Sequence, residues 1–161
     1  MAPGAHEAWM ELALGLAREA ASRGDVPVGA VVVCGKQVVG AGGNAREQRA
    51  DPTDHAEVVA LRAAAATLGR WNLSDCDLYV TLEPCAMCAG AILVARIRRL
   101  VYGASDPKAG ACGSALEVVG NARGNHRVQV LAGVSAAESA ALLRAFFEAR
   151  RRTSGEVAEF G

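Results

Sequence analysis

The sequence predicts one layered α/β domain, and three observations lead to this expectation. Strand-like apolar runs alternate with segments of helical periodicity, which is the pattern of a sheet covered by helices. The length of 161 residues and the hydrophobic content of 52% suit a single domain with its own core. No internal repeat or linker interrupts the chain. We therefore expect one domain over residues 1–152 and a flexible tail over residues 153–161.

The chain begins with a predicted helix and hairpin. Apolar residues recur at helical spacing over residues 6–22, and Gly24 ends that segment. Residues 28–34 form a short apolar run rich in β-branched side chains, which predicts a strand. Because Gly35-Lys36 reads as a turn, residues 37–41 are expected to return as the second strand of a hairpin.

Beyond the hairpin, a loop opened by glycines runs to Pro52, and helices then alternate with strands. Apolar or alanine-rich segments predict the helices, and short β-branched runs predict the strands. These elements are, in order, a helix over 55–67, a strand over 78–82, a helix over 86–96, a strand over 99–102, a glycine-rich segment over 103–125 with at most one short helix near 115–119, a strand over 128–131 and a helix over 135–152.

Composition argues against several classes of protein. No stretch reaches the roughly 18 uninterrupted apolar residues that a membrane span needs. The N-terminal stretch carries acidic residues and no basic leader, so no secretory signal is visible and a cytoplasmic location is expected. The five cysteines are an odd number in a chain of this size, which does not suggest a disulfide framework. For Cys34, Cys76 and Cys112 we expect packing or surface roles.

The charges are balanced overall but unevenly distributed. A formal net charge of zero argues mildly against a nucleic-acid-binding protein. Residues 90–152, however, hold ten Lys and Arg against four acids, whereas residues 1–89 hold seven against eleven. This asymmetry suggests one side that faces a polyanion. The alternative is that Arg96, Arg98 and Arg99 only solvate a junction between a helix and a strand.

Two short motifs, His55-Ala56-Glu57 and Pro84-Cys85-Ala86-Met87-Cys88, carry the chemistry. Together they supply one imidazole, two thiols and one carboxylate. Catalytic zinc sites use three protein ligands and leave the fourth position for water. Pro84 predicts a helix start, where the positive end of the helix favours ionised thiols. The combination of H-x-E with P-C-x-x-C is the signature of zinc-dependent nucleoside and nucleobase deaminases.

In this interpretation His55, Cys85 and Cys88 bind Zn²⁺, and Glu57 transfers protons. Hydrolytic deamination needs such a carboxylate, because the departing amine must be protonated before it leaves. Each residue also has a simpler interpretation. Cys85 and Cys88 could form a thioredoxin-like redox pair, Glu57 could cap a helix together with Asp54, and His55 could be a core histidine.

Five blocks of sequence extend this pattern along the chain. They are Asp25-Val26-Pro27-Val28-Gly29-Ala30, Asp51-Pro52-Thr53-x-His55-Ala56-Glu57, Leu78-Tyr79-Val80-Thr81-Leu82-Glu83-Pro84-Cys85-x-Met87-Cys88-Ala89-Gly90-Ala91, Gly103-Ala104-x-Asp106-x-Lys108-x-Gly110-Ala111 and Asn125-His126-Arg127-Val128. With these blocks the chain, from about Trp9 to Arg152, resembles the bacterial tRNA-specific adenosine deaminases of the cytidine deaminase superfamily. The first three blocks are shared with free-base deaminases, and the last two are more characteristic of the tRNA enzymes.

The resemblance implies a three-layer α/β/α fold with a central mixed five-stranded sheet, and a homodimer. It also implies conversion of adenosine to inosine at the wobble position of a tRNA anticodon, on the arginine tRNA that carries ACG. One Zn²⁺ per chain would be the cofactor, with no organic cofactor, and a tRNA anticodon stem-loop would be the partner. By the same resemblance, the substrate-binding residues are Asn44, Ala56, Asp106, Lys108, Asn125 and Phe147.

Other interpretations stay open at this point. Asp106 and Lys108 could simply form a turn, and Phe147 could belong to the core. A free-base or nucleoside deaminase acting on guanine or cytosine would use the same metal chemistry without the basic C-terminal half. A non-catalytic zinc- or redox-binding module would leave Glu57 without a role.

Overall fold

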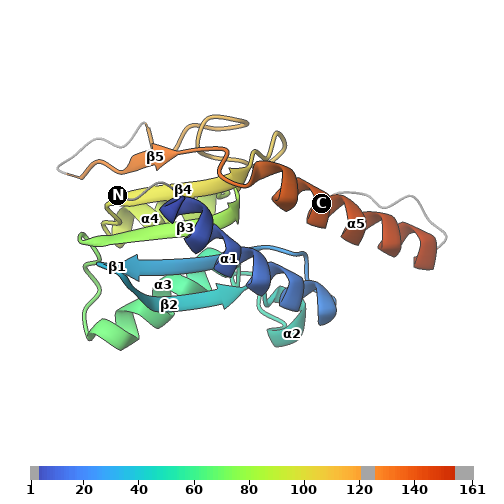
Figure 1. The fold of residues 1–161 in the computed structure, drawn as a ribbon, viewed down its shortest axis with the longest axis horizontal. Helices are drawn as coiled ribbons and strands as arrows, with labels where there is room; N and C mark the ends of the chain where they lie inside the picture. Colours follow the sequence, from blue (N-terminus) through green and yellow to red (C-terminus); the bar gives the residue numbers. More distant parts are fainter. Residues whose placement is uncertain (1–3, 121–125, 155–161) are drawn as a thin grey trace.

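A computed structural model describes residues 4–120 and 126–154 and shows a mixed five-stranded sheet between helices (Figure 1). The strands are β1 (Gly29–Cys34), β2 (Gln37–Gly43), β3 (Cys76–Leu82), β4 (Arg99–Ala104) and β5 (Gln129–Leu131). Their order in the sheet is β2-β1-β3-β4-β5. Strand β1 is antiparallel to both of its neighbours, whereas β3, β4 and β5 are parallel. The expected α/β class and mixed sheet are confirmed.

Helices cover both faces of this sheet, which gives the three layers that the resemblance implied. The helices are α1 (Ala5–Ser22), α2 (Arg46–Arg49), α3 (Ala56–Leu68), α4 (Ala86–Val94) and α5 (Ala136–Ser154). Helix α1 packs on one face with α5 beside it, and α3 and α4 pack on the other face. Within the described part of the chain, no helix is long and apolar enough to cross a membrane.

Alternation along the central strands divides the core into two clusters. In β1, Val31 and Val33 pack against α1, while Ala30 and Val32 pack towards α3 and α4. Successive side chains of a strand point to opposite faces, so both sets are buried at once. Strands covered on both faces read as continuous apolar runs. This is why β1 appears in the sequence as an unbroken run of apolar residues and not as an alternation of apolar and polar residues.

Strand β2 is longer than its sequence suggested, because its glycines allow helices to approach closely. We expected the hairpin to end at residue 41 and Gly42-Gly43 to open a loop, since glycine usually weakens a strand. The structure continues β2 through Gly43. A Cβ at Gly42 would collide with the side chain of Val59 in α3, and a Cβ at Gly43 would lie 2.9 Å from the carbonyl oxygen of Leu16 in α1.

The same close approach occurs at Gly29, which predicts a large loss of stability for Gly29→Ala. The added Cβ would collide with the carbonyl oxygen of Ala13 and lie 2.7 Å from the backbone nitrogen of Ala17. Because backbone atoms cannot rotate away, we expect the free energy of unfolding in urea to fall by about 3 kcal/mol. Gly15→Ala is the control, because a Cβ there meets nothing within 4 Å and should stabilise α1 by about 0.5–1 kcal/mol. Equal stability of both variants would contradict the packing of α1 on β1.

No helix forms near residues 115–119, where the sequence allowed at most one short helix. This segment forms turns and one isolated bridge between Cys112 and Glu117. Its backbone N–H groups bind elsewhere: those of Ala115 and Leu116 both donate to the carbonyl oxygen of Gly110, at 2.9 and 3.0 Å. A helix would need each N–H to donate to the carbonyl oxygen four residues earlier.

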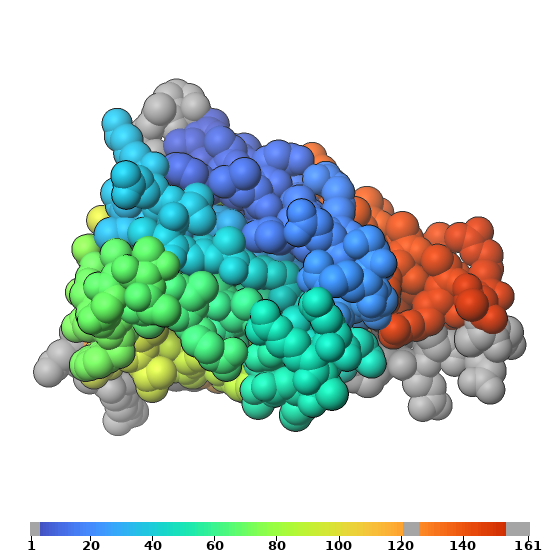
Figure 2. Space-filling view, turned by 90° about the horizontal axis from the view of Figure 1, so that it is seen from below, coloured from blue at the N-terminus to red at the C-terminus, as the bar shows by residue number. Residues whose placement is uncertain are grey.

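Conversely, α2 lies inside the segment that the sequence predicted as a loop. This four-residue helix has no apolar face, so periodicity gives no signal for it. The buried carboxylate of Asp25 accepts hydrogen bonds from the backbone N–H groups of Glu47 and Gln48, at 2.8 and 3.3 Å. In Figure 2 the segment around α2 (teal) lies beside the C-terminal end of α1 (blue).

The remaining predicted bounds agree with the observed bounds within two residues. Helix α5 continues to Ser154, two residues beyond the predicted end of the domain, and residues 155–161 of the predicted tail lie outside the described residues. Figure 1 shows that α5 starts beside the end of β4 and extends beyond the ends of the strands.

Candidate metal centre and active site

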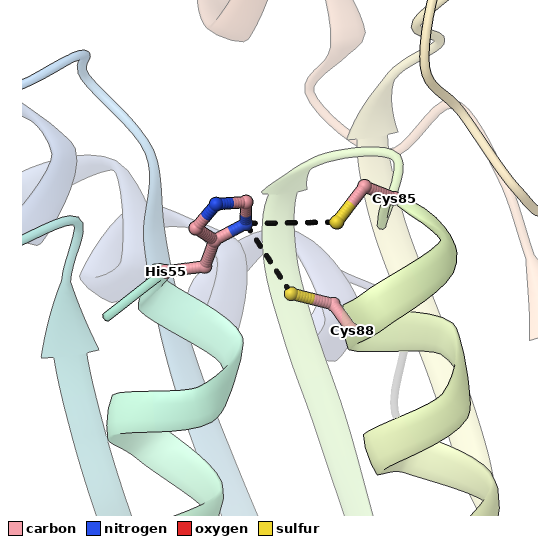
Figure 3. Close-up of side chains that lie close together, drawn as sticks. All are labelled: His55, Cys85 and Cys88. Carbon is pink, nitrogen blue, oxygen red and sulfur yellow. Dashed lines mark hydrogen bonds between the residues drawn. The ribbon is translucent and has the colours of Figure 1, made fainter. Parts of the chain in front are cut away.

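The two predicted motifs lie at the N-termini of two neighbouring helices. His55 is the N-cap of α3 and Cys85 is the N-cap of α4, and both have extended backbone conformations before the first turn. Strand β3 ends at Leu82 and leads through Glu83-Pro84 into Cys85. Since α3 and α4 pack on the same face of the sheet, their first turns bring these side chains together (Figure 3).

His55, Cys85 and Cys88 converge with a spacing that suits a tetrahedral metal ion. The Nδ1 atom of His55 lies 3.6 Å from Sγ of Cys85 and 3.5 Å from Sγ of Cys88. All three ligand atoms lie within 4.8 Å of one another, and both cysteines are free thiols. Zinc bonds of about 2.0–2.1 Å to nitrogen and about 2.3 Å to sulfur give a tetrahedral edge of about 3.6 Å. The residues therefore fit the expected ion.

The charges of this cluster also suit a divalent cation. A hydrogen bond from Cys88, followed by one from His55, lowers the pKa of Cys85 to about 3. The same bond to Cys85, together with burial, raises the pKa of Cys88. The hydrogen bond with Cys85 raises the pKa of His55. Thiols and imidazolium groups release their protons when they bind a metal, so a cation would replace the hydrogen bonds that join these side chains.

Glu57 lies next to this cluster in the first turn of α3, with 4% of the residue exposed. Burial is the main cause that raises the pKa of its carboxyl to about 6. A carboxyl group that titrates near neutrality is suited to both accepting and donating a proton. The predicted alternative, a capping box with Asp54, is not formed. Asp54 instead accepts hydrogen bonds from Arg49 and Arg62, and α3 has no side-chain N-cap bond.

Two of the predicted substrate residues lie next to the metal-ligand segment. Ala56 directly follows His55 and is buried. Asn44 directly follows β2 and is 8% exposed, and its side-chain oxygen accepts a hydrogen bond from the backbone N–H of Arg46 at 3.2 Å. The next residue, Ala45, donates its N–H to the carbonyl oxygen of Asp54 at 2.9 Å, which ties this loop to the start of α3.

Asp106 and Lys108 lie on the loop after β4, and Asp106 forms the turn that the sequence left as an alternative. Its carboxylate accepts hydrogen bonds from the backbone N–H groups of Lys108 and Ala109, at 3.1 and 3.2 Å. The backbone N–H of Asp106 donates to Glu83 at 3.0 Å, so the loop is held beside the cysteine segment. The turn is formed by the carboxylate of Asp106, and the side chain of Lys108 is exposed, so the turn is compatible with substrate contact by Lys108.

Of the other two predicted substrate residues, the structure describes only Phe147. Asn125 lies outside the described residues. Phe147 is half-buried on α5, with its ring 5.4 Å from that of Phe146 in an edge-to-face arrangement.

Part of the basic charge of the C-terminal half is neutralised within the fold. Arg98 pairs with both carboxylate oxygens of the buried Asp77, at 2.9 and 3.0 Å, and Arg99 lies 3.8 Å from the same carboxylate. These residues lie at the start of β3 and β4, whereas Cys85 follows the other end of β3. Ion pairs with Asp77 therefore account for the positive charges of Arg98 and Arg99 better than binding of a polyanion would.

Glu83 holds the surroundings of the site together, and the sequence did not reveal this role. It is 2% exposed, and its carboxylate accepts backbone N–H bonds from Asp106, Cys112 and Ser114 and a hydroxyl bond from Ser114, at 2.5–3.2 Å. Burial by itself would raise the pKa of Glu83, but these hydrogen bonds outweigh it and the pKa is lowered. Glu83 thus fastens the loop after β4 to the segment that carries the cysteines.

We expect Glu83→Gln to lower the free energy of unfolding by about 2–3 kcal/mol. An amide has one acceptor oxygen, so its NH₂ group would face backbone donors that now bind a carboxylate. Urea denaturation measures the change, and Glu138→Gln, at an exposed glutamate of α5, serves as the control. Equal stability of the two variants would mean that the loop after β4 is not held by Glu83.

Comparisons with known proteins agree with this geometry. A family model described as MafB19-like deaminase matches residues 4–151. A tRNA-specific adenosine deaminase from Agrobacterium fabrum is 48% identical over 143 residues, which cover 89% of this chain and 94% of that protein.

Solved structures give the same result. One from a study of A-to-I editing by tRNA:A34 deaminases at the wobble position has a TM-score of 0.81 and 47% identity, covering 84% of this chain and 99% of the other. A guanine deaminase from Nitrosomonas europaea has a TM-score of 0.74 and 28% identity, covering 90% of this chain and 84% of the other. With its five-stranded mixed sheet and its His-Cys-Cys cluster, the chain therefore belongs to the family of the bacterial tRNA-specific adenosine deaminases.

Proposed function

We propose that this protein is a Zn²⁺-dependent enzyme that converts adenosine to inosine at the wobble position of a tRNA anticodon. The observation that carries this proposal is the convergence of His55, Cys85 and Cys88 beside the buried carboxyl of Glu57. Identity to a tRNA-specific adenosine deaminase and likeness to a tRNA:A34 deaminase support the choice of substrate. A tRNA substrate also supports a cytoplasmic location.

One Zn²⁺ per active site would be held by Nδ1 of His55 and by the sulfurs of Cys85 and Cys88, whose spacing fits it. When bound, Zn²⁺ supplies a water that is activated at neutral pH. Within the described residues the cluster offers three protein ligands, which is the number found in catalytic sites.

Glu57 would carry out the proton transfers. Its carboxylate takes a proton from the attacking water and delivers it to the ring nitrogen N1 of adenine as the oxygen adds to C6. The carboxylate then takes the remaining proton from the hydroxyl on C6 and passes it to the exocyclic amine. The C6–nitrogen bond breaks, ammonia leaves and the C6–oxygen bond becomes the carbonyl of inosine. The raised pKa of Glu57 suits this repeated exchange.

The substrate contacts belong to the same proposal. Asn44 and Ala56 lie near enough to the ligand segment to contact the target base, and the loop of Asp106 and Lys108 would contact the anticodon loop. Asn125 and Phe147 are proposed to contribute from the flanking segments. A wobble base is already single-stranded, so moving it into a pocket costs little.

We also propose a homodimer that forms through the outer surface of α3 and α4. An apolar groove there is lined by Val58, Leu61, Arg62, Ala65, Trp71, Leu73, Ala91, Val94 and Ala95. Trp71 is 65% exposed and Val94 is 68% exposed, which is unusual for large apolar side chains unless another surface covers them.

Val94→Glu should give a monomer in analytical ultracentrifugation, because a charge would then lie in the proposed interface. A dimer that persists would place the interface elsewhere.

The function is tested by incubating the zinc-loaded protein with an arginine tRNA bearing ACG and, separately, with cytosine, guanine and free adenosine. We expect inosine at the first anticodon position of the tRNA and no ammonia from the free compounds. Ammonia from guanine, without inosine in the tRNA, would instead establish the activity named for the Nitrosomonas europaea relative.

A further inference from the structure

A second group of metal-ligand side chains lies at the other end of β3 from the active site. Cys34 ends β1 and Cys76 begins β3, and the two residues are partners in the antiparallel register. Asp75 immediately precedes Cys76. Since β3 extends by about 3.3 Å per residue, its seven residues separate this group from the Cys85 segment by about 20 Å. The group is therefore independent of the proposed active site.

The three side chains lie close together, and each sulfur lies near a different oxygen of the Asp75 carboxylate, whereas in the active site both sulfurs lie near one nitrogen. Sγ of Cys34 lies 3.4 Å from one carboxylate oxygen of Asp75, and Sγ of Cys76 lies 3.5 Å from the other. One ligand atom from each residue lies within 4.8 Å of the others. A zinc ion bound to sulfur at about 2.3 Å and to oxygen at about 2.0–2.2 Å gives tetrahedral edges of about 3.6 Å. Each of the two sulfur-to-oxygen distances is therefore close to the edge expected around a thiophilic ion.

The surroundings provide the charge and the hydrogen bonds that such a site needs. Arg70 donates to both carboxylate oxygens of Asp75, at 2.8 and 3.0 Å. Ligating carboxylates are normally held by such partners. Two thiolates and one carboxylate carry three negative charges, which a divalent ion and the guanidinium of Arg70 would balance. Cys76 is buried, Cys34 is partly buried and Asp75 is exposed, so an ion can enter from solvent.

We propose that Cys34, Asp75 and Cys76 form a second binding site for a thiophilic divalent cation of the Zn²⁺ or Cd²⁺ type. The ion would join the end of β1 to the start of β3. Arg70 holds the pKa of Asp75 at about 2, so the carboxylate is ionised. Cys34 and Cys76 are free thiols, and a cation would displace their protons, because thiolates are the form that binds metal.

Metal counting on the purified full chain tests this site. The protein is stripped of metal under reducing conditions, titrated with Zn²⁺ and desalted, and zinc per chain is measured. We expect two equivalents in the wild type and one in Cys34→Ser, in Asp75→Asn and in His55→Ala, the last of which removes a ligand of the other site. Cys112→Ser, at a half-buried free cysteine outside both groups, should keep two.

A second measurement separates loss of the site from loss of the fold. Addition of Zn²⁺ to His55→Ala should raise its Tm, and the rise should disappear when Asp75→Asn is added. One equivalent in the wild type, or two in Cys34→Ser, would overturn the proposal. So would a metal-free wild type in which two thiols become titratable only after reduction, because Cys34 and Cys76 would then be joined by a disulfide.

Discussion

Glu57→Gln is expected to lower the rate of adenosine deamination in tRNA by about 10²–10⁴-fold or more while leaving zinc binding intact. The amide has nearly the same volume as the carboxyl and can remain in the buried first turn of α3. It cannot accept a proton from water or return one to the departing amine. Without that delivery the leaving group would be amide ion, which is a very poor leaving group.

Single-turnover kinetics with saturating tRNA measures this effect directly. Zinc content and Tm should match the wild type, and Glu19→Gln, at an exposed glutamate of α1, should retain full activity. A Glu57→Gln variant with wild-type turnover would show that another group transfers the protons, and the mechanism proposed above would be wrong.

Removal of one metal ligand is the second change with a large expected effect. Cys88→Ser should lose one equivalent of zinc and at least about 10³-fold in activity, because the pKa of water rises from about 7 to about 15.7 when the ion is absent. Cys88 is fully buried and contributes one of the two sulfurs next to His55. A serine hydroxyl is a much poorer ligand for Zn²⁺ than a thiolate.

Cys112→Ser is the matched control, because Cys112 is also a free cysteine near the cysteine segment but lies outside the ligand group. It should keep both zinc and activity. Chelation of the wild type should abolish activity, and Zn²⁺ should restore it. If Cys88→Ser kept its full zinc content and rate, His55 and Cys85 would need a different third ligand.

The order of helices and strands could be predicted because most of these elements have clear local sequence patterns. Strands buried on both faces appear as β-branched runs, and helices α1 and α3 as alanine- and leucine-rich segments. What the sequence could not give depends on contacts between distant elements. Gly42 and Gly43 belong to a strand because helices press on both of its faces, and α2 forms because Asp25 caps it from another segment.

The residues of the site also fall into those that the sequence predicted and those that only the fold brings together. The proposed ligands His55, Cys85 and Cys88 could be recognised because each motif is local and begins a helix. Glu83 could not, because its partners follow it by more than twenty residues and meet it only in the folded chain. The second ligand group depends on the register that pairs Cys34 with Cys76, and the sequence alone suggested only packing or surface roles for both cysteines.

Anomalous X-ray diffraction at the zinc edge, on crystals of the zinc-loaded protein, tests the central claim most directly. The account predicts an anomalous peak about 2.0–2.4 Å from Nδ1 of His55 and from the sulfurs of Cys85 and Cys88, with Glu57 beside it. A bond between the two sulfurs, or an imidazole turned away from an empty position, would contradict it.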